Sequence, residues 1–393
     1  MTYAQDRICW DADSHLMPLP DFLSRHADAR WHDDLLIGGG ANGGEAFEKW
    51  FGKMVSDVAT RRADSDKTAE LEENVIASAK GWYAHGACHA EERSRTLDLL
   101  GFRGQLVFST FAGEHLRSPN PDLVYAGTRA HTRAMVDFCS GDPRLLPVAM
   151  IPLGDPERAL AELDEALRLG IAAVQVPSDP PGGHQKGFSP AHVELDPFWA
   201  RLAEARVPAI LHIGGGRLLP RPYHENGRPR PKDWLGGGEN LRAKDFPAVH
   251  QSPENFLNAL VLDGVFDAHP ALKCGVIELG ATWVPGFVRN LDHAFDSFRR
   301  NEPRLQALSL KPSEFVRRQI KFTPFPFEDA GWLVEQGGEE LFLFSSDYPH
   351  PEGGRDPIGR FERSFDAAET SPSARTRFYS RNFEDLFGLS ARD

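Results

Sequence analysis

The sequence predicts an α/β protein whose architecture is a (β/α)8 TIM barrel, and two observations carry this prediction. Short runs of apolar and β-branched residues alternate with helical patterns along most of the 393 residues, which is typical of a parallel sheet. Oxygen and imidazole side chains follow several of these runs directly, as they do at the carboxyl-terminal mouth of a barrel. A doubly wound open sheet is the structural alternative.

Eight runs have the length and composition of buried strands. In chain order they are residues 8–12, 105–109, 146–151, 172–176, 209–213, 273–278, 320–323 and 341–345. The clearest helix between them begins where Asp155 can cap it and Pro156 suits its first turn, and it ends at Gly170. Eight strands with intervening helices close most simply into one barrel, so we expect a single domain over residues 1–393.

Two long insertions interrupt this alternation. One covers about residues 16–95, after the first strand, and the other covers about residues 214–250, after the fifth. Both leave a strand at the end where a barrel carries its chemistry, so we expect them to shape a substrate pocket or a subunit contact. Arg217, in the second insertion, is a candidate for binding a substrate carboxylate through its guanidinium group. A solvated basic loop is the alternative.

Composition disfavours several classes of partner and location. The formal net charge of -13 disfavours nucleic acid and anionic membranes. The four cysteines lack the spacing of a zinc cluster or a disulfide framework, which favours a reducing, cytoplasmic setting. No apolar run is long enough to span a bilayer. A small-molecule substrate is the expected partner, and a homodimer is the expected assembly because twofold dimers are the commonest.

Four residues at predicted strand ends form a candidate metal site. Asp13 and His15 are two apart on an extended segment, so their side chains point to the same side. His212 ends the fifth run, where a satisfied core imidazole is the alternative. Asp347 follows an almost wholly apolar run, and a carboxylate there must be paired or metal-bound to offset its lost hydration. This nitrogen and oxygen set suits one zinc ion, with manganese or iron as alternatives.

Two further side chains accompany this set. Glu278 closes the sixth run and is a candidate general base or ligand, with a structural ion pair as an equal alternative. His350 follows Asp347 by three positions and is a candidate substrate contact, unless it merely ends the strand between two prolines.

Several segments together resemble a known family. They are residues 11–15 (DADSH), residues 91–101 beginning Glu-Glu-Arg, His212, residues 346–350 (SDYPH) and residues 381–388. In this order they look like the amidohydrolase-related branch of the amidohydrolase superfamily, which includes aminocarboxymuconate semialdehyde decarboxylase-like enzymes. The resemblance covers nearly the whole chain. It implies a (β/α)8 barrel, a divalent metal, and hydrolysis or nonoxidative decarboxylation of a small molecule.

Two positions depart from that family's pattern. Asp13 stands where the first histidine of an H-x-H pair is usual, and a carboxylate there weakens the pull of the site on a bound water. Glu278 stands where the sixth strand commonly ends in a histidine that serves as a ligand or acid/base in relatives. Because this histidine is replaced by Glu278, we rank hydrolysis slightly ahead of decarboxylation.

The leading interpretation is therefore a metal-dependent hydrolase of a small organic substrate, such as an aromatic acid or a ring-cleavage product. Its metal would be held by Asp13, His15, His212 and Asp347. Asp347 or Glu278 would take the proton of the activated water and return it to the leaving group. The alternatives are a nonoxidative decarboxylase of a small carboxylic acid and a catalytically inactive barrel used for binding.

Overall fold

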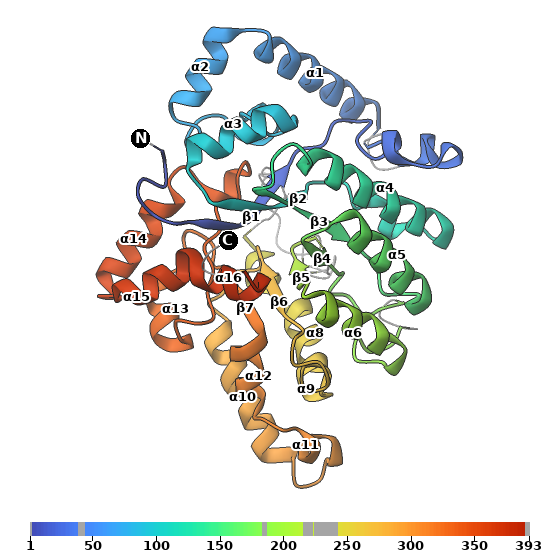
Figure 1. Ribbon diagram of the computed structural model, residues 1–393, viewed down its shortest axis with the longest axis vertical. Coiled ribbons are helices and arrows are strands. Elements are labelled where there is room, and N and C mark those ends of the chain that lie inside the picture. The colour runs from blue at the N-terminus through green and yellow to red at the C-terminus, as the bar shows by residue number, and fades with distance from the viewer. Residues whose placement is uncertain (1, 38–43, 183–186, 215–222, 224–242, 390–393) are drawn as a thin grey trace. The chain divides into compact units, whose positions relative to one another are not determined.

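The computed structural model describes residues 2–37, 44–182, 187–214, 223 and 243–389. The chain divides into two compact units. The first comprises Met1–Met150, Asp164–Ala172 and Ser346–Pro357, and the second comprises Ile151–Leu163, Ala173–Ser345 and Ile358–Asp393. Each unit combines parallel strands with helices (Figure 1).

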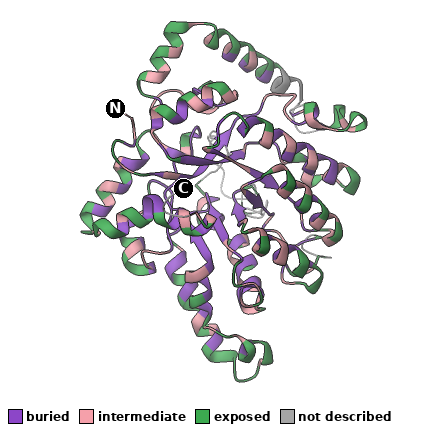
Figure 2. Ribbon diagram, in the orientation of Figure 1, coloured by how far each residue is buried: buried purple, intermediate pink, exposed green. Residues whose placement is uncertain are grey.

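The first unit holds three parallel strands that pair in chain order. They are β1 (Trp10–Leu16), β2 (Gly104–Ser109) and β3 (Leu145–Met150). Parallel neighbours need a crossover connection, and α3 (Ala90–Leu100) returns the chain to β2 while α4 (Pro121–Cys139) returns it to β3. The strands are largely buried (Figure 2), so polar side chains at their ends are held rigidly.

The insertion after β1 is partly helical and returns to the end of that strand. It contains α1 (Gly44–Arg62) and α2 (Ser65–Glu73). Asp64 caps α2 by accepting the backbone N–H groups of Asp66 and Lys67, each at 3.1 Å. The Trp82 indole N–H then donates to the carbonyl of Pro18 at 3.0 Å. This hydrogen bond ties the end of the insertion to the residues just beyond β1.

The second unit holds four parallel strands, again paired in chain order. They are β4 (Ala173–Gln175), β5 (Ala209–His212), β6 (Cys274–Ile277) and β7 (Ile320–Phe322). The helices that lead into β5, β6 and β7 are α6 (Asp196–Ala205), α8 (Gln251–Leu262), α9 (Val265–Ala268), α10 (Val284–Phe298), α11 (Pro303–Ala307) and α12 (Pro312–Gln319).

The remaining helices follow β3 or β7. They are α5 (Pro156–Leu169), α13 (Ala330–Gly337), α14 (Pro357–Ala367), α15 (Pro372–Thr376) and α16 (Asn382–Phe387). The helix predicted between Asp155 and Gly170 is confirmed as α5. None of the helices in the described ranges is long and apolar enough to cross a bilayer.

The strand predicted at residues 341–345 does not form a regular ladder. Phe342 makes one parallel bridge to Phe322 of β7, and the Leu343 N–H donates to the Phe322 carbonyl at 2.9 Å. Pairing stops there because Pro324 and Pro326 follow β7, and proline has no N–H to extend a ladder. The predicted alternation of parallel strands and helices is confirmed. The prediction of eight regular strands is wrong for the described residues, which form seven.

Candidate metal centre

The end of β1 brings two predicted ligands together. His15 Nε2 lies 3.2 Å from Asp13 Oδ1, and both side chains are about 1% exposed. The pairing of β1 with β2 is irregular between Asp11 and Ser14, and such a bulge redirects side chains near functional sites. The structure brings the Asp13 and His15 side chains together, and their role as metal ligands stays a prediction.

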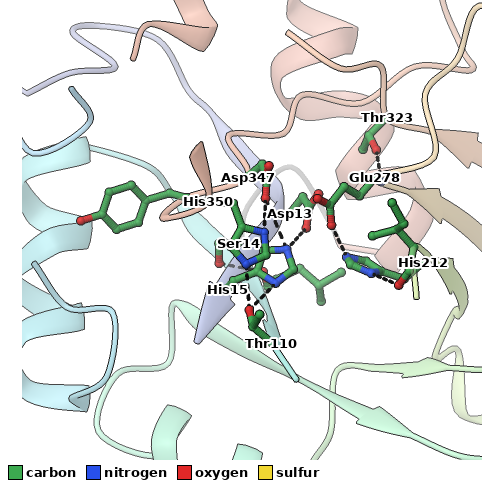
Figure 3. Close-up of polar contacts among 12 residues, drawn as sticks. Asp13, Ser14, His15, Thr110, His212, Glu278, Thr323, Asp347 and His350 are labelled. Atoms are coloured by element: carbon green, nitrogen blue, oxygen red, sulfur yellow. Dashed lines mark hydrogen bonds and ion pairs between the residues drawn. The ribbon is translucent and has the colours of Figure 1, made fainter. Parts of the chain in front are cut away.

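The segment after Ser346 brings two more polar side chains to the same place. The Asp347 N–H donates to the Asp13 carbonyl at 2.9 Å. Asp347 Oδ1 lies 3.4 Å from His15 Nε2 and 3.0 Å from His350 Nδ1 (Figure 3). The backbone of Asp347 is left-handed, with φ of 51°, a conformation that aspartate adopts more readily than most residues. It turns the chain just after the buried apolar run.

Thr110, the first residue after β2, also belongs to this cluster. Its hydroxyl oxygen lies 2.8 Å from His350 Nε2 and 3.3 Å from His15 Nδ1 (Figure 3). The two imidazole rings are stacked, with centroids 3.8 Å apart. The sequence analysis missed Thr110, although the position directly after a predicted strand is the signal that identified the other residues.

The donor spacing in this cluster fits a divalent metal. Two ligands about 2.1 Å from one ion lie about 3.0 to 3.4 Å apart at octahedral or tetrahedral angles. The separations of 3.2 and 3.4 Å from His15 Nε2 to Asp13 and Asp347 fall in that range. Burial is the main cause that lowers the pKa of His15, so its ring is neutral near pH 7 and keeps a lone pair for a metal.

The second unit carries its own buried pair at strand ends. His212 ends β5, and Glu278 follows β6. The His212 Nδ1–H donates to the carbonyl of Ile213 at 3.0 Å, which orients Nε2 toward Glu278 Oε2 at 3.3 Å (Figure 3). The Glu278 N–H donates to the Thr323 hydroxyl at 3.0 Å. A histidine held through one nitrogen in this way is typical of metal ligands.

The buried Asp11 carboxylate hydrogen-bonds to the segments that carry the cluster of the first unit. Its carboxylate accepts the N–H and the hydroxyl of Ser346 at 2.8 and 2.6 Å, and the amide of Gln105 at 2.8 Å. It also accepts the N–H of Asp13 at 3.3 Å. Burial raises the pKa of Asp11 to about 7, against the lowering effect of these hydrogen bonds. Asp11 thus holds the two segments that carry Asp13 and Asp347.

Replacing Asp11 with alanine is expected to lower the free energy of unfolding by about 2 to 3 kcal/mol, because buried donors of Ser346 and Gln105 lose their acceptor. Urea unfolding at pH 7 measures this loss. The control is Asp6→Ala, since Asp6 is exposed and its removal is expected to change stability by less than about 0.5 kcal/mol. Equal effects of the two variants would contradict the proposed support.

Arg217 and most of the insertion predicted at about 214–250 lie outside the described residues. Its role in binding substrate therefore stays a prediction, as do the catalytic roles of Asp347 and Glu278 and the substrate contact of His350.

The chain was compared with known protein families and with curated protein sequences. A family model described as amidohydrolase matches residues 10–389. No curated protein sequence matches the chain.

Several solved structures share the fold. An amidohydrolase from Mycobacterium avium subsp. paratuberculosis K-10 is 21% identical, with a TM-score of 0.72 over 98% of this chain and 100% of its own. A 5-carboxyvanillate decarboxylase from Novosphingobium aromaticivorans DSM 12444, complexed with manganese and 4-hydroxy-3-methoxy-5-nitrobenzoic acid, is 18% identical, with a TM-score of 0.63 over 99% and 98%. A dihydroxybenzoic acid decarboxylase from Polaromonas sp. JS666, with manganese and 2-nitroresorcinol, is 17% identical, with a TM-score of 0.60 over 98% and 97%.

Proposed function

The chain belongs to the amidohydrolase family, and we propose that within it this protein is a metal-dependent decarboxylase of a small organic acid. The observation that carries the proposal is the buried cluster of Asp13, His15, Asp347 and His350, whose spacing suits a divalent metal. Decarboxylation is favoured over other reactions because two solved structures of the same fold are manganese-containing decarboxylases of aromatic acids.

The proposed ligand set is Asp13, His15, His212 and Asp347. Asp13 and His15 lie in β1, His212 ends β5 and Asp347 follows a run of buried residues. In a (β/α)8 barrel spanning residues 1–393 the carboxyl ends of the strands share one mouth. Two carboxylates and two imidazoles suit zinc, manganese or iron, and the manganese of the two decarboxylases supports manganese. Asp13 adds a negative charge where relatives are expected to have a neutral histidine.

A bound divalent metal would hold the substrate carboxylate and an adjacent oxygen, orienting them and withdrawing electron density. Asp347 and His350, 3.0 Å apart, can together hold a proton beside the substrate. As the carbon–carbon bond breaks, its electron pair stays on the substrate carbon, which takes this proton, and carbon dioxide leaves. No water is consumed.

Hydrolysis is the second candidate reaction, and the buried position of Glu278 beside His212 is the observation that favours it. Its carboxylate pairs with His212 at 3.3 Å, at a position where a general base for water can stand. The family match supports hydrolysis only at the level of the family. Incorporation of oxygen from labelled water into product distinguishes hydrolysis from release of carbon dioxide without such incorporation.

Metal analysis of the purified full chain tests the proposed centre. We expect about one divalent ion per chain after reconstitution with manganese or zinc, and loss of that ion in a His212→Ala, Asp347→Ala double variant. The matched control is His32→Ala, Asp33→Ala, which removes a pair 3.2 Å apart that is exposed on the surface.

Retention of metal in the control together with its loss in the double variant supports the site. Carbon dioxide release is then screened with 5-carboxyvanillate and 2,6-dihydroxybenzoate, the acids acted on by proteins of the same fold. A wild-type chain that binds no divalent metal after reconstitution would contradict the proposal and favour an inactive barrel. A cytoplasmic location and a homodimer remain our predictions for the assembly.

A further inference from the structure

The chain turns sharply after β6, and the turn begins at Glu278. Glu278 has a left-handed backbone with φ of 55°, and Gly280 follows with φ of 67°. Glycine adopts this conformation freely, whereas a residue with a long side chain adopts it only at a cost in free energy. Such strained residues cluster at functional sites, so a glutamate kept at this position is evidence that its carboxylate has a function.

The Glu278 carboxylate faces His212, which ends β5. Glu278 Oε2 lies 3.3 Å from His212 Nε2, and the two side chains are 2% and 4% exposed (Figure 3). Two ligands of one divalent ion lie about 3.0 to 3.4 Å apart, and this separation falls in that range. Carboxylate oxygen and imidazole nitrogen are also donor types that zinc and manganese bind. The pair therefore has the spacing and the chemistry of two ligands.

Two links to the segment after β7 hold the turn that carries Glu278. The Glu278 N–H donates to the Thr323 hydroxyl at 3.0 Å, which fixes the strained residue at its own backbone. Further along the turn, the N–H groups of Ala281 and Thr282 donate to the Glu328 carboxylate at 3.0 and 2.8 Å. The Thr282 hydroxyl donates to the same carboxylate. Glu328 therefore fixes the end of the turn, as Thr323 fixes its start.

Glu328 is itself held by the loop that carries it. Its Oε2 accepts the Phe325 N–H at 2.7 Å, and its own N–H donates to the Phe325 carbonyl at 2.9 Å. A side-chain carbon added at Gly280 would lie 3.3 Å from the Phe325 ring, so the two loops also pack closely. One carboxylate thus receives four donors from two loops. Hydrogen bonds to a carboxylate are stronger than those between neutral groups, so Glu328 joins the loops firmly.

We propose that Glu278 binds the metal together with His212, and that Glu328 is the positioning residue that holds the Glu278 carboxylate in place against its strained backbone. Glu328 acts through the turn and not on the metal, because its oxygens accept the donors of the two loops. The inference rests on the proposed metal centre. It goes beyond the proposed ligand set by adding a donor that follows β6 and by naming the residue that places this donor.

A double-mutant cycle on zinc affinity tests the link between the two glutamates. Competition with a chelator measures zinc binding to the full chain of the wild type, Glu278→Ala, Glu328→Gln and the variant with both changes. Either single change is expected to weaken zinc binding about 10- to 100-fold, the first by removing a ligand and the second by misplacing it. In the Glu278→Ala background, Glu328→Gln is expected to change the affinity by less than about twofold, because no carboxylate is left to position.

Glu314→Gln is the matched control, because Glu314 accepts the Lys311 N–H at 2.8 Å at the start of a different helix, α12. Its zinc affinity is expected to stay within about twofold of the wild type. An equal loss from Glu328→Gln in both backgrounds would show that Glu328 acts on the fold alone, and it would overturn the inference. Wild-type affinity in Glu278→Ala would do the same. A wild-type chain that binds no zinc overturns the metal centre as well.

Thermal unfolding of the metal-free chain tests the strain at position 278 independently. Glycine usually lowers stability relative to alanine, but at a left-handed position it raises it. Glu278→Gly is therefore expected to unfold about 1 to 2 °C above Glu278→Ala. A lower midpoint for the glycine variant would mean that the Glu278 backbone is unstrained, and the proposal that Glu328 holds it against strain would fail.

Discussion

Replacing Asp347 with asparagine is expected to lower turnover by about 100- to 10,000-fold, the usual contribution of a positioned proton-transfer group. The fold is expected to survive, because asparagine has the same shape and tolerates the left-handed backbone, φ of 51°, that Asp347 adopts. Its amide oxygen can take the place of Asp347 Oδ1, which lies 3.0 Å from His350 Nδ1. The substitution therefore removes the negative charge and the ability to take a proton, and it weakens one of the proposed metal ligands, so metal content must be measured alongside turnover.

Carbon dioxide release under steady-state conditions measures the loss, with metal content and thermal midpoint recorded on the same samples. Asp356→Asn is the control, since it makes the same change on an exposed residue of the same unit and is expected to leave turnover unchanged. If Asp347→Asn kept both its metal and near wild-type turnover, Asp347 would have no part in proton transfer, and Glu278 would become the leading candidate.

The sequence analysis located the proposed ligands of the first unit because their placement is local. Asp13 and His15 are two residues apart on one strand, and an extended backbone points such side chains to the same side. Asp347 was recognised because an ionised side chain directly after a buried apolar run needs a partner. Both arguments need only a few neighbouring residues, and the structure confirms the resulting contact at 3.2 Å between Asp13 and His15.

The features that the sequence analysis missed depend on contacts between distant parts of the chain. Thr110 meets His15 across 95 sequence positions and His350 across 240, so its place after a predicted strand does not show which residues it contacts. The last predicted strand failed for a similar reason, since its pairing is limited by prolines that follow β7 and not by its own apolar sequence. The β1 irregularity at Asp13 likewise depends on the register with β2.

Two buried histidines outside the proposed ligand set are together expected to contribute about 4 kcal/mol of destabilisation on acidification from pH 7 to pH 5, which the raised pKa of Asp11 partly offsets. Burial lowers the pKa of His115 to about 4 and that of His131 to about 3, and the nearby His115 adds to the shift of His131. A side-chain carbon added at Gly127 would lie 2.4 Å from the His115 ring. The ring therefore packs directly on α4, and there is little room to hydrate a charged form.

The sign of this pH effect follows from the number of protons that the folded and unfolded states bind. An unfolded histidine titrates near 6.5, so between pH 6.5 and the lowered folded values the unfolded chain binds more protons, and stability rises with pH. The stabilisation is present above about pH 6.5 and is lost as the pH falls. At pH 5 each histidine accounts for about 2 kcal/mol of that loss. Asp11, whose raised pKa of about 7 acts in the opposite direction, is common to every variant and cancels in comparisons.

Urea unfolding of the metal-free chain at pH 7, 6 and 5 measures this effect without a contribution from metal release. In a His115→Gln, His131→Gln double variant the decline in stability should be smaller by about 4 kcal/mol, whatever the stability at pH 7. His32→Gln, which removes an exposed histidine, should keep the full decline. A double variant that declined as steeply as the wild type would mean that both rings are hydrated in the folded protein, and that acid sensitivity arises elsewhere in the chain.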